Sequence, residues 1–258
     1  MQGNAILETK GVRKEFNGFV AVANVDYTLY EGETAGIIGP NGAGKSTFFN
    51  LLTGMFPPSR GQVLFAGRDI SRLASYDRVA AGIIRTFQLV SVFDSLKVLD
   101  NLVLANARFG GGHSTGFRFF LGDRHGEEIV TACRNALEMV GIADKADWLA
   151  SELSYGDKRK LEIAMALSLR PKILLLDEPF AGLSDAEITD VLELVERVKK
   201  GFSLVIIEHK ISRIVDLVDK LSVMHEGSII AEGKPAEVLA DREVRRVYWG
   251  QGGADDCC

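Results

Sequence analysis

The chain has 258 residues, and its 30 Lys and Arg against 35 Asp and Glu give a net charge of −5 at neutral pH. A hydrophobic share of 47% with 25% charged residues excludes intrinsic disorder as the main state. The longest run without a charged residue has 14 residues (46–59), whereas a membrane-spanning helix needs about 20. Residues 1–5 show no signal-peptide pattern. Because the chain has no excess of basic residues, no nucleic-acid partner is expected. The net charge does not exclude a local basic patch.

The three cysteines have neither a metal-ligand spacing nor a disulfide pattern. Cys133 lies in a helical pattern and is expected to be a small buried residue. Cys257 and Cys258 end a tail that reads as frayed, with a lipid acceptor or a redox pair as the alternatives.

The first third of the chain predicts strands and one helix around a glycine-rich turn. Residues 6–9 and 20–29 have the mixed alternation of an edge hairpin or small antiparallel sheet. Residues 33–38 predict a buried strand that runs into the turn. A helix is expected from Lys45 to a stop at Gly54 and the following prolines.

The middle of the chain, from 96 to about 169, has helical patterns at 127–140 and 157–169 and no convincing strand. Between them, 108–126 holds a glycine triplet and three phenylalanines (Phe117, Phe119 and Phe120). We interpret this segment as a mobile loop, whose aromatic cluster is either exposed or caps the core of the lobe.

Further short apolar runs at 173–176, 203–207 and 221–224 are typical of strands buried on both faces of a parallel sheet. Residues 185–200 and 210–218 read as amphipathic helices. Strand and helix in alternation predict an α/β fold with a ligand at the carboxyl ends of the strands.

The strongest motif follows the strand at 33–38 and fits G-x-x-x-x-G-K-[ST]. Its glycines let backbone N–H groups turn inward around a phosphate chain, beside the positive end of the next helix. Lys45 would reach the β- and γ-phosphates, and the Ser46 hydroxyl would be a Mg²⁺ ligand. The motif therefore predicts an ATP site at Gly39, Pro40, Asn41, Gly42, Ala43, Gly44, Lys45, Ser46 and Thr47.

A second motif ends the apolar strand at 173–176 with two carboxylates, Asp177 and Glu178. Because unpaired buried charge is costly, such a strand end is expected to meet cations or water. Asp177 would hold Mg²⁺, and Glu178 would position and polarise the attacking water. His209 ends the strand at 203–207 on the same sheet edge, where it is either structural or a hydrogen-bond donor to the γ-phosphate.

With these motifs in place, the chain resembles the ATP-binding subunits of ABC transporters over nearly its whole length. Residues 153–157 match the signature of that family, so the resemblance implies that Ser154 and Gly156 contact the γ-phosphate bound to a second subunit. Gln88 matches the glutamine that senses Mg²⁺ and couples to the membrane subunit. Phe16 matches the aromatic residue that stacks on adenine, although a β-sheet aromatic is often part of the core.

The sequence departs from the family pattern at three positions. Tyr155 and Asp157 replace the commoner Gly and Gln of the signature, and Ser184 replaces an Asp. Ser184 with Glu187 also fits a capping box that opens the next helix, so a structural role and a role in subunit communication both stay open.

Several segments are most similar to the branched-chain (hydrophobic) amino-acid importers: 85–88, 153–156, 181–183 and the tail 244–250. Urea and amide importers share these motifs, which leaves the substrate open. The lipopolysaccharide-export ATPase is an alternative, because the tail of this chain and its residues 177–182 are also similar to that protein.

The resemblance implies an α/β fold: a P-loop NTPase (RecA-like) core, 1–87 and 171–235, with an antiparallel β subdomain. An inserted α-helical lobe (88–170) and a helical tail (236–258) complete it. The expected cofactors are ATP and Mg²⁺. The expected partners are a second ATP-binding subunit, two integral membrane permeases and, indirectly, an extracytoplasmic substrate-binding protein. The subunit would lie peripherally on the cytoplasmic face of the inner membrane.

A groove beside Gln88 should receive a membrane-subunit helix, with Val90, Val92 and Phe93 as candidate contacts. Two other classes compete with this interpretation. A soluble ABC-type ATPase of DNA repair, cluster assembly or translation would never dock on a membrane. A regulatory nucleotide sensor without turnover is disfavoured, because Glu178, Gln88 and His209 are all present.

Overall fold

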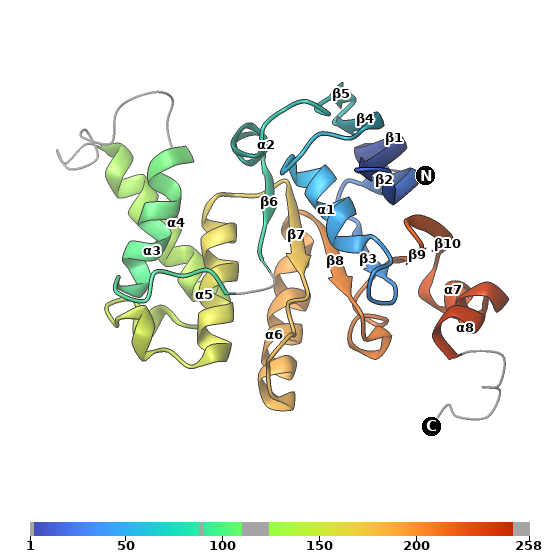
Figure 1. Cartoon of the computed structure of the whole chain (residues 1–258). Helices are drawn as coiled ribbons and strands as arrows, with labels where there is room; N and C mark the ends of the chain where they lie inside the picture. Colours follow the sequence, from blue (N-terminus) through green and yellow to red (C-terminus); the bar gives the residue numbers. More distant parts are fainter. Residues whose placement is uncertain (1–2, 88–89, 110–123, 250–258) are drawn as a thin grey trace.

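The computed structural model describes residues 3–87, 90–109 and 124–249. Two sheets form the core of the molecule, and a group of helices lies to one side of them (Figure 1). The smaller sheet has the order β2-β1-β4-β5 with antiparallel pairing throughout. Its strands are β1 (Ala5–Phe16), β2 (Phe19–Tyr30), β4 (Arg60–Phe65) and β5 (Arg68–Asp69). The predicted hairpin is therefore confirmed, with longer strands than the pattern indicated.

The larger sheet has the order β10-β9-β3-β8-β7-β6, and all its neighbours are parallel except β10 and β9. Its strands are β3 (Thr34–Ile38), β6 (Ile83–Arg85), β7 (Ile173–Asp177), β8 (Ser203–Glu208), β9 (Lys220–His225) and β10 (Ser228–Gly233). Every residue of β3, β7 and β8 is buried, as the apolar runs predicted. The carboxyl ends of these three strands lie side by side and form one edge.

Alternate residues of the parallel strands pack into two separate hydrophobic cores, one on each face of the sheet. Ile37, Leu175 and Val205 pack with the antiparallel sheet and with α1 (Lys45–Thr53). Ile38, Leu174 and the rest of the other face pack with α6 (Asp185–Val198) and with the lobe. The lobe thus shares a continuous core with one face of the sheet.

The inserted lobe is helical, as expected. It consists of α3 (Val98–Phe109), α4 (Arg124–Val140) and α5 (Tyr155–Ser168), and in its described part only an isolated bridge, Lys97 to Leu149, has strand pairing. Cys133 is buried, as predicted. The phenylalanine cluster between α3 and α4 lies outside the described residues, as do Gln88 and the terminal cysteines.

The remaining helices are α2 (Ser75–Ala81), α7 (Pro235–Ala240) and α8 (Arg242–Trp249). None of the described helices has the length and apolar character needed to cross a membrane. The predicted tail contains α7 and α8 as far as Trp249, the last described residue. The sequence patterns had not indicated β4, β5, α2, β6 or β10.

The predicted helix at 210–218 is wrong. The structure has a single 3₁₀ turn, Ile211–Arg213, followed by further turns. Ile214 and Leu217 donate backbone hydrogen bonds three residues back, to Ile211 and Ile214. Buried Ile214 and Leu217 are three residues apart, a spacing that suits consecutive tight turns as well as an α-helix.

Candidate functional site

The loop 39–47 leaves β3 and enters α1, and its backbone demands glycine at two positions. A Cβ atom on Gly39 would lie 2.3 Å from the Met224 carbonyl oxygen. One on Gly44 would lie 2.5 Å from the Ala21 carbonyl oxygen, and Gly44 caps α1 with φ of 98°. The close approach of neighbouring backbone therefore explains both glycines. The first turn of α1 directs its free N–H groups at the loop, as in an anion site.

A cleft of about 590 Å³ opens over this loop. Its lining comes from the loop, from the hairpin end of the antiparallel sheet and from Glu178 beyond the end of β7. The full lining is Phe19, Val20, Ala21, Asn41, Gly42, Ala43, Gly44, Lys45, Ser46, Thr47, Glu178, Glu226 and Gly227. This size and this donor set fit a nucleotide with its phosphates on the loop.

Lys45 lies at the junction of the loop and the carboxylates. Its ammonium group donates hydrogen bonds to the carbonyl oxygens of Gly39 (2.7 Å) and Pro40 (3.1 Å). Burial lowers the pKa of Lys45, and the charges of Glu178, Asp177 and Glu208 oppose that shift. The amine is thus within the electrostatic reach of the same acids that the sequence predicted for metal and water.

Asp177 ends β7 and is almost fully buried. Arg85 at the end of β6 donates to its carboxylate at 2.5 Å. The same guanidinium donates to Asn50 Oδ1 at 2.6 Å and lies near the rings of Phe49 and Phe87. A single cation therefore ties the predicted Mg²⁺ ligand to the helix that carries the phosphate loop.

Glu178 adopts a left-handed backbone conformation, with φ of 46°. Its N–H donates to the Ile207 carbonyl oxygen of β8, which fixes the residue at the strand edge. For a residue other than glycine this conformation costs conformational free energy, and such strained residues are frequent at functional sites.

His209 Nδ1 lies 4.0 Å from Glu178 and 3.8 Å from Glu208. Glu208 is fully buried, accepts hydrogen bonds from the Phe180 and His209 amides, and has its pKa raised by burial. The structure therefore brings Lys45, Asp177, Glu178 and His209 together, as predicted.

Ser154 and Gly156 are not among the residues that line the cleft of their own chain. Ser154 is the N-cap of α5, and its hydroxyl accepts a hydrogen bond from the Asp157 amide at 3.1 Å. Gly156 N–H donates to Glu187 at 3.0 Å. Within one chain the signature turn, residues 154–157, stays separate from the phosphate loop.

Phe16 also lies outside the cleft lining. Its ring packs edge-on against Phe56, 5.3 Å between centroids, and Lys14 lies over both rings. Phe19, its partner across the end of the β1–β2 hairpin, lines the cleft and is 69% exposed.

Sequence patterns did not single out the contacts that hold Phe87, the last described residue before Gln88. The Phe87 amide donates to Glu162 at 3.0 Å, and Arg159 donates to the Phe87 carbonyl oxygen at 2.9 Å. Arg159 and Glu162 also pair with each other at 2.7 Å. The only available signal was a pair of charges on the buried face of α5.

Comparisons with known proteins agree with this geometry. The ABC transporter family model matches residues 22–181, and a model described as branched-chain amino acid ATP-binding cassette transporter matches residues 228–251. The branched-chain amino acid transport ATP-binding protein LivG of Escherichia coli is 34% identical over 95% of this chain and 98% of its own length. BraF of Pseudomonas aeruginosa, also named as a branched-chain amino acid transport ATP-binding protein, is 33% identical over 95% of this chain and 98% of its own length.

Among solved structures, the ADP conformation of MJ1267, an ATP-binding cassette of an ABC transporter, superposes with a TM-score of 0.83. It is 34% identical and covers 96% of this chain and 99% of its own. The fold and the site thus define an ATP-binding cassette. The chain belongs to the ABC transporter family, with the C-terminal segment of its branched-chain amino acid branch.

Proposed function

We propose that this chain is the ATP-hydrolysing subunit of an ABC importer that takes up branched-chain or other hydrophobic amino acids. Related amides or urea are the alternative cargo. One observation carries the ATPase proposal: residues 41–47 of the phosphate loop and the strand-end acid Glu178 line one cleft, and the charge of Asp177 reaches Lys45 in that lining. The names of LivG and BraF and the matching C-terminal segment support the amino-acid cargo.

The residues divide the chemistry between them. The loop amides and Lys45 would bind the phosphate chain, and the aromatic hairpin end, Phe16 and Phe19, would contact the adenine ring. Glu178 would orient and polarise the attacking water, and His209 would donate to the γ-phosphate. Mg²⁺, held by Ser46, Asp177 and Gln88, would neutralise charge on the phosphate oxygens.

A second subunit would complete the site. Ser154 and Gly156 lie outside the cleft lining of their own chain, so they would meet a γ-phosphate in the cleft of another chain. We therefore propose a head-to-tail pair, as a homodimer or heterodimer, that closes on two ATP molecules. Closure and reopening would drive two permease subunits between inward- and outward-facing states.

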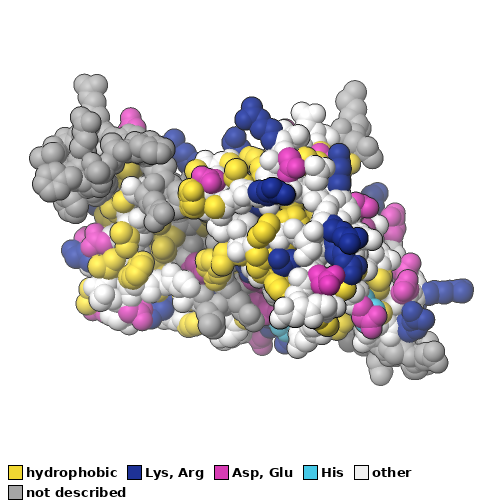
Figure 2. All heavy atoms as spheres, turned by 45° about the horizontal axis from the view of Figure 1, so that its top comes forward, with side chains coloured by type: hydrophobic (Ala, Val, Ile, Leu, Met, Phe, Trp, Pro, Cys, Tyr) yellow, Lys and Arg dark blue, Asp and Glu magenta, His cyan; other side chains and the backbone are white. Residues whose placement is uncertain are grey.

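The permeases would dock at the α2 end of the molecule. A small groove of about 180 Å³ between α1, α2 and β6 is lined in part by Met55 and Phe87, both about half exposed. Tyr76 of α2 is also exposed, and Figure 2 shows hydrophobic side chains gathered across this face. Of the contacts predicted from sequence, Phe93 is exposed, whereas Val92 packs against the core. Such docking would hold the subunit peripherally on the cytoplasmic face of the inner membrane.

The test of catalysis is Glu178→Gln. We expect this variant to bind ATP while steady-state hydrolysis falls by at least two orders of magnitude, because the water loses its polarising group. Asp185→Asn, which removes an exposed carboxylate nearby in the sequence, is the matched control and should hydrolyse ATP normally. Hydrolysis near wild type in Glu178→Gln would show that the assigned role is wrong, and unchanged ATP affinity in Lys45→Ala would contradict the phosphate loop.

The test of transport is to identify the genes beside this one and to reconstitute the chain with any permeases and binding protein found there. Uptake of radiolabelled leucine that requires ATP supports the proposal. Neighbours of a lipopolysaccharide-export system, or no membrane partner at all, would contradict it. Met55→Glu should abolish co-purification with the permeases, whereas Trp148→Glu, a control on the lobe that is also about half exposed, should not.

A further inference from the structure

Glu187 on α6 reaches across to the signature turn of α5. We infer that Glu187 is a positioning residue for this turn, and that its negative charge sets the ATP concentration at which two subunits close. The inference rests on the proposed function, because it assumes that Gly156 meets the γ-phosphate of an ATP molecule in a second cleft.

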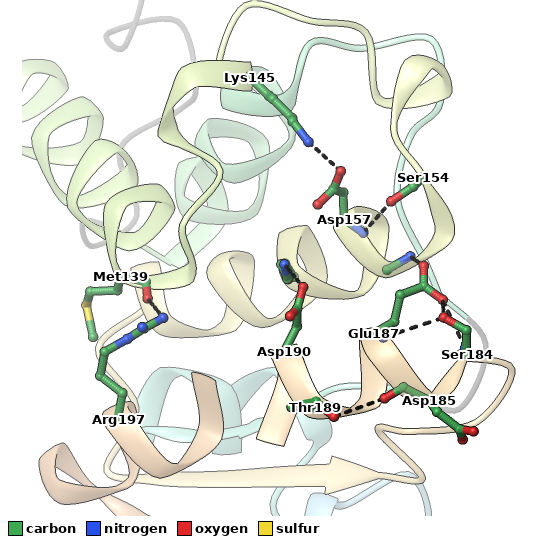
Figure 3. A network of polar contacts seen from close by, with 12 residues as sticks. Met139, Lys145, Ser154, Asp157, Ser184, Asp185, Glu187, Thr189, Asp190 and Arg197 are labelled. Atoms are coloured by element: carbon green, nitrogen blue, oxygen red, sulfur yellow. Dashed lines mark hydrogen bonds and ion pairs between the residues drawn. The ribbon is translucent and has the colours of Figure 1, made fainter. Parts of the chain in front are cut away.

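The Glu187 carboxylate joins two segments that are far apart in the sequence. Oε1 accepts from the Gly156 amide at 3.0 Å. Oε2 accepts from the Ser184 amide at 3.0 Å and from the Ser184 hydroxyl at 2.7 Å. Figure 3 shows this carboxylate lying between α5 and the first turn of α6. The capping box of α6 thus serves the N-terminus of a second helix as well.

The first turn of α5 has few other acceptors for its amides. Ser154, the N-cap, takes the Asp157 amide, which leaves the Gly156 amide to Glu187. A Cβ atom on Gly156 would lie 2.6 Å from Glu187 Oε1, so any other residue at this position would push the Glu187 side chain out of this contact. An anion at a helix N-terminus is favourable, and here a side chain of the same chain supplies it.

Glu187 also connects the turn to the hydrolytic half of the site. Ser184 belongs to the segment that follows Glu178, and Gly182 in that segment lies against the Tyr155 ring. Farther along α6, Asp190 pairs with Lys160 of α5 at 3.0 Å, and Arg197 donates to the Met139 carbonyl oxygen (Figure 3). Together these contacts fix the lobe and its signature turn against α6.

The γ-phosphate and the Glu187 carboxylate are two anions that share one donor, the Gly156 amide. The γ-phosphate and the carboxylate would repel each other if both approached the Gly156 amide. Closure on ATP therefore requires Glu187 to release this amide, or to share it at a cost in electrostatic free energy. Removing the charge while keeping an acceptor oxygen, as in Glu187→Gln, lowers that cost. The same change weakens a favourable charge at the α5 N-terminus, so fold stability moves in the opposite direction.

The experiment measures ATP-dependent dimerisation of the full chain in the Glu178→Gln background by size-exclusion chromatography with light scattering. Glu187→Gln is expected to lower the ATP concentration for half-maximal dimer by about two- to fivefold, the effect of one charge at a helix N-terminus. In the otherwise wild-type chain it should lower KM for ATP by a similar factor with kcat unchanged. Ser184→Ala is the matched control: it removes a hydrogen bond from Glu187 but keeps the charge, so the ATP requirement should not fall.

An unchanged or higher ATP requirement in Glu187→Gln overturns the inference. The inference also predicts a lower melting temperature for Glu187→Gln, so KM is the discriminating readout. A lower melting temperature in both variants with KM for ATP unchanged would mean a merely structural role and would also overturn the inference. If the parent Glu178→Gln chain binds ATP but forms no dimer with itself or with its partner subunit, the head-to-tail pairing of the proposed function fails, and the inference fails with it.

Discussion

The ion pair between Arg85 and Asp177 offers a quantitative test of the site. Both side chains are nearly buried, 9% and 6% exposed, with 2.5 Å between the guanidinium and the carboxylate. Arg85→Met would leave Asp177 buried without its cation, a change that typically costs about 3–5 kcal/mol of unfolding free energy. Asp177→Asn in the same chain removes the orphaned charge, so the double variant should recover part of that loss, with a coupling energy of about 2–3 kcal/mol.

The measurement is a double-mutant cycle from urea unfolding of the full chain, analysed by linear extrapolation. The control cycle uses Lys97 and Asp147, a pair at 3.4 Å whose side chains are 51% and 80% exposed. Exposed pairs of this kind contribute less than about 1 kcal/mol. If the coupling of the buried pair were no larger than that of the control, Arg85 would not be what holds Asp177 in place. The proposed tie between the metal ligand and α1 would then be refuted.

Three further predictions concern the supporting residues. Arg78→Met should lower the free energy of unfolding in urea by at least about 3 kcal/mol. The buried Arg78 guanidinium donates to five carbonyl oxygens, two of them near the end of α1. The exposed control Arg72→Met should change it by no more than about 0.5 kcal/mol. Burial raises the pKa of Glu208, so the wild-type fold loses stability as the pH rises from the ordinary pKa of a glutamic acid through this raised pKa. Glu208→Gln does not ionise and should therefore gain stability relative to wild type above the raised pKa, and a constant difference across the pH range would contradict this. Phe16→Ala and Phe19→Ala should each weaken binding of a fluorescent ATP analogue by about 1–3 kcal/mol, and the ring whose loss has no effect does not contact the base.

The parts of the site that the sequence predicted are those built within short segments. The phosphate loop lies in nine consecutive residues, and its glycines are needed because Met224 and Ala21 crowd the backbone. Asp177 and Glu178 end a strand whose apolar run is visible without any partner. Parallel strands then bring such ends together, so the clustering with His209 follows from the fold class.

The parts that were missed depend on contacts between distant segments. Arg85 joins Asn50 and Asp177, and no local pattern connects these three positions. The error at 210–218 had a different cause: buried residues that lie three positions apart fit a 3₁₀ turn as well as an α-helix. Short strands such as β6 carry too few residues for a pattern and are recognisable only by their pairing with β7.

The three departures from the family pattern are easier to understand together than one by one. Tyr155 has Gly182 against its ring, Asp157 pairs with Lys145 at 2.5 Å, and Ser184 shares the Glu187 carboxylate with Gly156. All three therefore fix the signature turn, either to the segment that follows Glu178 or to the lobe. A chain with Gly, Gln and Asp at these positions would lack the ring, the Lys145 ion pair and the hydroxyl donor to Glu187. Restoring a single family residue here should thus weaken the turn, and only a combined exchange would test whether the common signature works in this framework.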